Sequence, residues 1–149
     1  MSETRQRQFW MGILAKAPLA MLESTLKPLE PLPAYQFLRP PEIGLTMVRG
    51  RTGGTGALFN LGEIPLTRCV VQIADRPDIQ GFGYVAGRSR RHAELAALCD
   101  ALLQHPDWLE LIQTQVIEPL QAAATEAKTS QNRQTAATQV NFYTMLRGE

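Results

Sequence analysis

Cysteine is scarce in this sequence. Only two occur among 149 residues, Cys69 and Cys99, and both stand inside apolar segments. No CxxC pair is present, which excludes a zinc ribbon, a thioredoxin-like redox motif and a dense disulfide scaffold. We expect both thiols to be buried, reduced side chains of a cytosolic protein.

An excess of charge of one sign and long apolar runs are also missing. The 15 basic and 14 acidic side chains leave a net charge of +1, whereas proteins that bind nucleic acid through its phosphates carry a strong basic excess. No stretch approaches the roughly 20 apolar residues of a membrane helix. The N-terminal MSETRQRQFW is not followed by a signal-peptide core. The composition predicts a soluble, cytoplasmic protein that contacts neither nucleic acid nor membrane.

The remaining patterns indicate one α+β domain over residues 1–149. Apolar residues at helical spacing predict N-terminal helices within residues 1–28, the first over residues 4–16 and the second after Pro18. Residues 29–43 are rich in proline, which removes backbone donors and disfavours helix. We expect an extended connector there, with room for a short strand at Tyr35–Leu38.

Residues 44–87 change from a helical to an extended pattern. Short segments rich in apolar and β-branched residues are bounded by glycine, proline or aspartate. The expected strands are Leu45–Arg51, Leu58–Leu61, Leu66–Ala74 and Phe82–Ala86. The connections are too short for crossover helices, so the sheet must be mainly antiparallel, a β-meander. Its longest hairpin connection is expected at Asp75–Gln80.

A helical pair is expected over residues 88–120. Ser89 is the predicted N-cap of the first helix, and Pro119 is expected to end or kink the second. Residues 121–149 follow as a polar tether and an apolar tail, VNFYTMLRGE. The tether has almost no large apolar groups, so it is either an exposed helix or a loose linker. The tail must fold back as a strand or dock on another chain.

The most conspicuous motif is the glycine loop RTGGTG, residues 51–56. A Walker A loop needs Gly-Lys-Ser/Thr and a helix directly after it, but here no lysine follows and ALFN predicts a strand. The dinucleotide fingerprint fails for the same reason. A hairpin turn and a nest of glycine amides that binds an anion or a partner both stay open. This first candidate set comprises Arg51, Gly53, Gly54, Thr55, Gly56 and Arg68.

A second candidate set lies in GRSRRHAE, residues 87–94, and comprises Arg88, His92 and Glu94. Cations beside the free amides of a helix N-terminus suit phosphates or carboxylates, and a solvated basic face is the alternative. His92 and Glu94 are two residues apart and therefore point to different faces of a helix. No metal site is predicted, because His92 and His105 have no third ligand at a sensible spacing. No nucleophile paired with a base is evident, and no cofactor of its own is expected.

Several of these segments, taken in order, resemble one family. TRQRQFWMGILA is similar to the opening helix of PhnG, a subunit of the bacterial carbon–phosphorus (C–P) lyase core complex. RTGGTGALFNLGEIPLTRCVV and GYVAGRSRRHAELAALCDALLQ resemble its two most recognisable blocks. VIEPL and the terminal VNFYTMLRGE complete a collinear resemblance over nearly the whole chain.

The resemblance implies a role inside an assembly. Members of the family form a complex with the PhnH, PhnI and PhnJ subunits, and the system replaces the base of a nucleoside triphosphate with a phosphonate. The radical iron–sulfur step belongs to PhnJ, and nucleosidase chemistry is attributed to PhnI. An accessory, scaffolding subunit is therefore the leading hypothesis, with Phe142, Thr144 and Arg147 as docking anchors. A direct contribution to phosphate binding is one alternative, and a homo-oligomeric binding protein outside this pathway is another.

Overall fold

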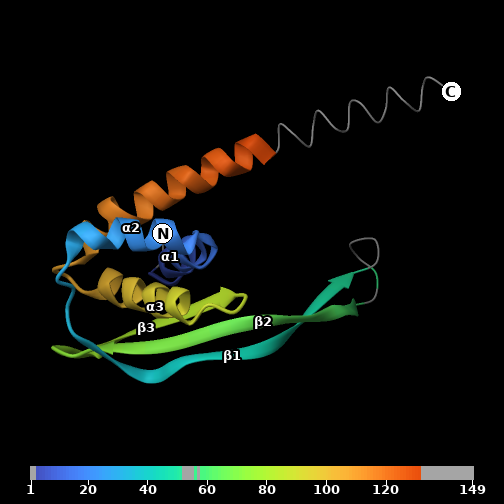
Figure 1. The fold of residues 1–149 in the computed structure, drawn as a ribbon, viewed down its shortest axis with the longest axis horizontal. Coiled ribbons are helices and arrows are strands. Elements are labelled where there is room, and N and C mark those ends of the chain that lie inside the picture. Colours follow the sequence, from blue (N-terminus) through green and yellow to red (C-terminus); the bar gives the residue numbers. More distant parts are fainter. Residues whose placement is uncertain (1–2, 52–55, 57, 132–149) are drawn as a thin grey trace.

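The computed structural model describes residues 3–51, 56 and 58–131. Figure 1 shows two layers, in which helices lie on one face of a three-stranded antiparallel sheet of order β1-β2-β3. The elements are α1 (Glu3–Lys16), α2 (Leu19–Leu26), the 3₁₀ turn η1 (Lys27–Leu29), β1 (Tyr35–Arg51), β2 (Leu58–Ile73), β3 (Arg76–Ala86), α3 (Arg90–Gln104), α4 (Leu109–Ile112) and the π-turn η2 (Gln113–Ile117). Residues 118–131 continue as helix. The predicted α+β class with an antiparallel meander is confirmed.

The N-terminal helices follow the apolar spacing of the sequence. In α1 the side chains of Trp10 and Leu14, four residues apart, are buried against the core. In α2 the same spacing buries Leu22 and Leu26. Phe9, which was expected on the apolar face of α1, is instead 48% exposed. The buried stripe of α1 is therefore narrower than the sequence pattern indicates.

The sheet begins nine residues earlier than predicted, because β1 starts at Tyr35. The expected connector is largely strand, and Pro40 and Pro41 lie inside it. Their missing N–H groups are tolerated because β1 is an edge strand, and its pairing with β2 is irregular between Phe37 and Glu42. The high proline content therefore predicted a connector wrongly, because an edge strand needs hydrogen bonds along only one of its edges.

Two further strand predictions were wrong. Leu58–Leu61 and Leu66–Ala74 are parts of one strand, β2, which runs through Gly62 (φ +151°) and Pro65. The expected loop at Asp75–Gln80 is strand from Arg76 onward, since Ile73 pairs with Arg76 across a tight turn at Ala74 and Asp75. The structure therefore has three long strands where four short ones were expected.

Helix α3 lies unusually close to β3. A Cβ atom added to Gly81 would stand 1.9 Å from the carbonyl oxygen of Ala97, and one added to Gly83 would stand 2.2 Å from that of Ala93. Ala93, Ala97 and Ala101 form a stripe at i, i+4 and i+8 that faces these glycines. Small residues on both elements thus set the spacing between the helical layer and the sheet.

The C-terminal helix does not end at Pro119. The π-turn Gln113–Ile117 ends two residues before this proline, and helix then continues to Gln131. A π-turn shifts the hydrogen-bond register by one residue, which accommodates a proline nitrogen that has no hydrogen to donate. Of the two interpretations of the polar tether, an exposed helix is correct as far as Gln131. Residues 132–149, with the predicted anchors Phe142, Thr144 and Arg147, lie outside the described residues.

Candidate functional site

The feature that dominates the surface is a two-stranded arm. Strand β3 pairs with β2 only as far as Ala86, which lies opposite Leu66, whereas β1 and β2 continue to pair until Arg51 lies opposite Leu58. We call residues 43–51 and 58–65 the arm. Figure 1 shows it projecting beyond the helical layer. The glycine loop joins its two strands, so this first candidate motif stands at the far end of the arm.

Of the first candidate set, the structure describes little at the loop itself. Gly53, Gly54 and Thr55 lie outside the described residues, and the side chain of Arg51 does as well. Gly56 is placed as a bend of intermediate exposure. A hairpin turn and an anion nest at RTGGTG therefore both stay predictions.

Arg68 lies nearer the body of the sheet and already has a carboxylate partner. Its Nε stands 3.1 Å from Glu42 Oε1, and Arg39 Nε stands 3.7 Å from the same oxygen. All three side chains are about half exposed. Arg68 and Glu42 are direct cross-strand neighbours in the β1–β2 register. Because Glu42 balances one of the two guanidinium charges, an anion that binds Arg68 must compete with a carboxylate already beside it.

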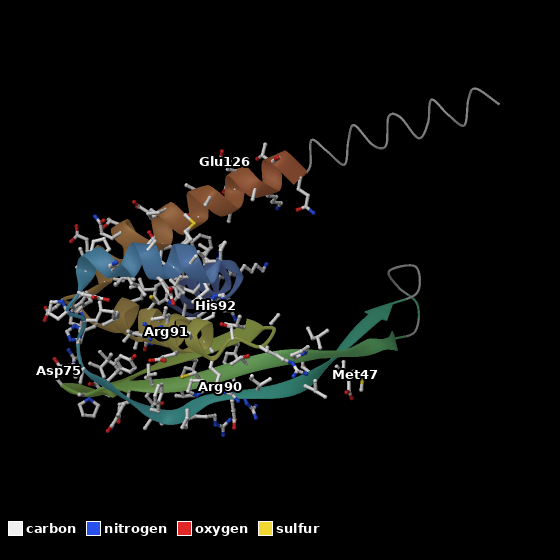
Figure 2. All side chains as sticks on the ribbon, in the orientation of Figure 1. Met47, Asp75, Arg90, Arg91, His92 and Glu126 are labelled. Atoms are coloured by element: carbon white, nitrogen blue, oxygen red, sulfur yellow. The ribbon has the colours of Figure 1, made fainter. Side chains whose placement is uncertain are left out.

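Apolar side chains of the arm stand in solvent. Leu45 is 63% exposed, Met47 46% and Ile64 40%. Met47 pairs with Glu63 and Leu45 with Pro65, so these side chains share one face of the ribbon, while Ile64 lies on the other. Figure 2 shows Met47 on the arm, well clear of the helices. Both faces of the arm therefore expose apolar side chains.

The second candidate set divides into different environments. Arg88 is exposed, whereas His92 is 7% exposed and its Nε2 lies 2.8 Å from the carbonyl oxygen of Leu14. The prediction that His92 belongs to a solvated or anion-binding face is not supported by this position. Its ring connects α3 to α1 instead. Helix α3 begins as predicted, since Ser89 Oγ accepts a hydrogen bond from the His92 N–H at 3.3 Å.

Glu94 is held in a separate cluster with Tyr35. It accepts a hydrogen bond from the Tyr35 hydroxyl, and Arg91 Nη1 stands 3.4 Å from its carboxylate. Burial, and then the hydrogen bond and charge of Glu94, raise the pKa of Tyr35 to about 12. Arg91 also approaches Glu23 at 3.7 Å. Both interactions join α3 to neighbouring elements, so this cluster holds the fold together.

The start of α3 is nevertheless fixed at the base of the arm. The Gly87 N–H donates to the Pro65 carbonyl at 2.8 Å, and the Thr67 hydroxyl donates to the Gly87 carbonyl at 2.7 Å. The same hydroxyl accepts a hydrogen bond from the Ser89 N–H at 3.1 Å. Thr67 is fully buried. This arrangement places the backbone of the GRSRRHAE segment, and with it Arg88, beside the point where the arm leaves the body.

Comparison with known proteins assigns the chain. The model of the family described as "PhnG: Phosphonate metabolism protein PhnG" matches residues 5–148. The chain belongs to the PhnG family. It is 38% identical over 147 residues to the alpha-D-ribose 1-methylphosphonate 5-triphosphate synthase subunit PhnG of Rhizobium meliloti (strain 1021), covering 97% of this chain and 90% of that protein. The resemblance inferred from the sequence blocks is confirmed, and a role outside phosphonate metabolism is set aside.

The most connected polar group of this PhnG-family chain escaped the sequence analysis. Asp100 is completely buried in α3, and its carboxylate accepts hydrogen bonds from Arg7 Nε and Nη2, Trp10 Nε1 and the Phe82 N–H at 2.9–3.2 Å. An aspartate in the middle of the apolar stripe of α3 was the available signal. These four hydrogen bonds join α1 and β3 to α3, so Asp100 organises the core.

Within residues 3–51, 56 and 58–131, no group of three or more His, Cys, Asp or Glu side chains could hold a metal ion. In the same part of the chain, no helix is long and apolar enough to cross a membrane. Cys69 and Cys99 are free and buried, as predicted. Burial raises the pKa of the Cys99 thiol to about 12, which makes it a poor nucleophile. The arrangement offers surfaces for contact and no assembled reaction centre among the described residues.

Proposed function

We propose that this chain is an accessory subunit of ribose 1-methylphosphonate 5-triphosphate synthase, acting with PhnH, PhnI and PhnJ in the C–P lyase system. In that system the base of a nucleoside triphosphate is replaced by a phosphonate. Family membership and the name of the Rhizobium relative as a synthase subunit support the pathway. The accessory role is supported by the arm.

The arm carries the proposal because it exposes apolar groups where the body of the protein cannot cover them. Leu45, Met47 and Ile64 are each at least 40% exposed, on a projection that bears the glycine loop at its end. Burying a leucine-sized side chain contributes about 1.5–3 kcal/mol. Covering three such side chains would contribute several kcal/mol to the free energy of binding a partner. Contact with a partner would also explain why the arm projects from the body of the fold.

Co-expression with PhnH, PhnI and PhnJ tests the proposal. The tagged chain should capture the other subunits, and Leu45→Asp should reduce that capture strongly. Leu38→Asp is the matched control, because Leu38 is the same residue type in the same strand and is 47% exposed, but lies outside the arm. Capture that is unaffected by Leu45→Asp, or equally reduced by Leu38→Asp, contradicts an accessory role that acts through the arm.

A second set of variants separates scaffolding from direct phosphate binding. Under the proposal, Arg51→Ala and Arg68→Ala change nucleotide binding of the complex only as far as they change assembly. If these variants leave the complex intact and weaken nucleotide binding, the loop contributes to the substrate site and the chain is more than a scaffold. Arg68 makes that outcome less expected, since its Nε is already paired with Glu42.

A further inference from the structure

The arm leaves one edge of β2 without a neighbouring strand. The last backbone hydrogen bond from the β3 side is that of the Gly87 N–H to the Pro65 carbonyl. The chain then turns away, because Thr67 binds the backbone of Gly87 and Ser89 and α3 begins. From Leu58 to Ile64, no strand among the described residues lies on this side of β2. We call this stretch the inner edge of the arm.

A two-stranded ribbon of this kind is physically incomplete. Isolated hairpins are marginally stable in water and need a third strand or a packed face. Strand edges with free N–H and C=O groups pair readily with other chains. The arm has both features, with apolar Leu45 and Met47 on one face and Ile64 on the other. A third strand would satisfy the backbone and cover apolar surface on both faces.

The pairing pattern identifies which backbone groups are offered. Pro65 directs its carbonyl toward Gly87, and therefore away from β1, so Pro65 and Leu45 form a pair that exchanges no hydrogen bonds across the β1–β2 ladder. Successive residues of a strand direct their N–H and C=O groups alternately to one neighbouring strand and to the opposite side. Glu63, two residues earlier and opposite Met47, thus directs its N–H and C=O to the inner edge. Its N–H can be removed without loss of a bond to β1.

The inner edge is better suited to the addition of a strand than the outer edge of β1. A strand added there continues the row occupied by β3 and extends the three-stranded sheet along the arm. A strand on the outer edge of β1 could not continue beyond the arm in the same way, because Pro40 and Pro41 follow there and the β1–β2 pairing is irregular between Phe37 and Glu42. Within the arm the register shifts between Val48 and Arg49, so the regular pairing next to the body covers residues 62–65. Prolines and irregularities at an edge hinder strand addition.

We propose that the inner edge of the arm binds an extended segment of a partner subunit as a third β-strand. Glu63 is exposed and shares its face with Met47, so the segment should place a basic side chain beside Glu63. On the opposite face it should place an apolar side chain beside Ile64. This inference rests on the proposed function, because the partner is taken to be another subunit of the synthase.

Glu63→Pro is the direct test, with Glu63→Ala as its matched control. Both remove the carboxylate, but only the proline removes the N–H. With PhnH, PhnI and PhnJ co-expressed, Glu63→Pro should weaken capture about tenfold or more relative to Glu63→Ala, the loss expected for one backbone hydrogen bond and its neighbours. Met47→Pro, compared with Met47→Ala, probes the outer edge and should have no comparable effect.

Hydrogen exchange of the wild-type chain supplies a readout that does not depend on the variants. The peptide covering residues 58–66 should exchange more slowly in the complex than in the isolated chain. Circular dichroism of isolated Glu63→Pro should match that of Glu63→Ala. If Glu63→Pro is misfolded, the exchange result decides, and unchanged exchange of this peptide overturns the inference.

The outcomes separate this inference from the proposed function. If the wild-type chain captures no partner subunit, the proposed function itself fails. If capture is normal and Glu63→Pro behaves like Glu63→Ala, only the strand addition is wrong. A deficit confined to Met47→Pro would assign the partner to the outer edge. Protection of residues 58–66 in the isolated chain would assign the edge to a second copy or to the chain's own residues 140–149. Either result overturns the inference.

Discussion

Replacing Gly81 with alanine should force α3 away from the sheet. The new Cβ atom would stand 1.9 Å from the Ala97 carbonyl oxygen and 2.8 Å from both the nitrogen and the Cβ of Ala101. These are backbone atoms or atoms bonded directly to the backbone, so no side-chain rotation can relieve the overlap. The backbone of Gly81 is not in the left-handed region, and the effect is therefore steric.

The expected cost follows from this geometry. Restoring a normal separation of about 3.5 Å requires α3 and β3 to move apart by about 1.5 Å, and a gap of about 1 Å already forfeits roughly half of the attraction between packed atoms. Overpacking of a core costs about 1–3 kcal/mol and occasionally more. Because none of the overlapping atoms belongs to a flexible side chain, we expect the free energy of unfolding to fall by about 3 kcal/mol or more. For a domain of this size, that lowers Tm by about 6–12 °C.

Urea unfolding and thermal melts of the isolated chain measure this loss. Gly44→Ala is the matched control, because a Cβ atom at Gly44 meets nothing within 4 Å. Gly44 also lies in the arm, away from α3. Gly44→Ala should change stability by less than about 1 kcal/mol. The argument from close packing is refuted if Gly81→Ala unfolds within about 1 kcal/mol of the wild type, or if the two variants behave alike.

Two further predictions concern polar groups that join α3 to other elements. Asp100→Asn removes the charge that Arg7 Nη2 approaches at 2.9 Å and should lower the free energy of unfolding in urea by about 2–3 kcal/mol. Asp107→Asn is the control, because Asp107 is exposed and its replacement should change this free energy little. Equal effects of the two variants would contradict the role of Asp100. The folded-state pKa of Tyr35 is raised from 10.0 to about 12, so its contribution to stability is complete below pH 10 and is lost as the pH rises toward 12. Wild-type stability should fall more steeply than that of Tyr35→Phe over this range, and parallel curves would be inconsistent with the assignment.

Local sequence patterns predicted correctly those features that depend on the residues of a single helix. The apolar spacing of α1 and α2 located their buried faces, and Ser89 was identified as the cap of α3. Local pattern failed where the environment overrides it. Pro40 and Pro41 were taken as signs of a connector, yet an edge strand leaves one side of its backbone free and accepts them.

The candidate site was only partly predictable for a similar reason. The glycine loop was correctly expected between two strands, but its position at the end of a projecting arm depends on how far β3 extends beside β2. Strand β3 ends at Ala86, directly before the Gly87 and Ser89 backbone groups that Thr67 binds at the start of α3. In the sequence, His92 stands beside exposed arginines and was grouped with them as a candidate anion ligand. Its burial and its contact with the Leu14 carbonyl depend on the packing of α1 against α3.

The sequence by itself determined the family, the α+β class and the absence of a CxxC metal or redox motif, because these depend on motif order, hydrophobic period and residue type. The tertiary structure alone decided which polar residues are buried and which surface is left incomplete. Asp100 is buried among partners that lie 18 to 93 residues away, and the inner edge of the arm exists because β3 ends before β2 does. Both depend on contacts between distant parts of the chain, which local patterns do not encode.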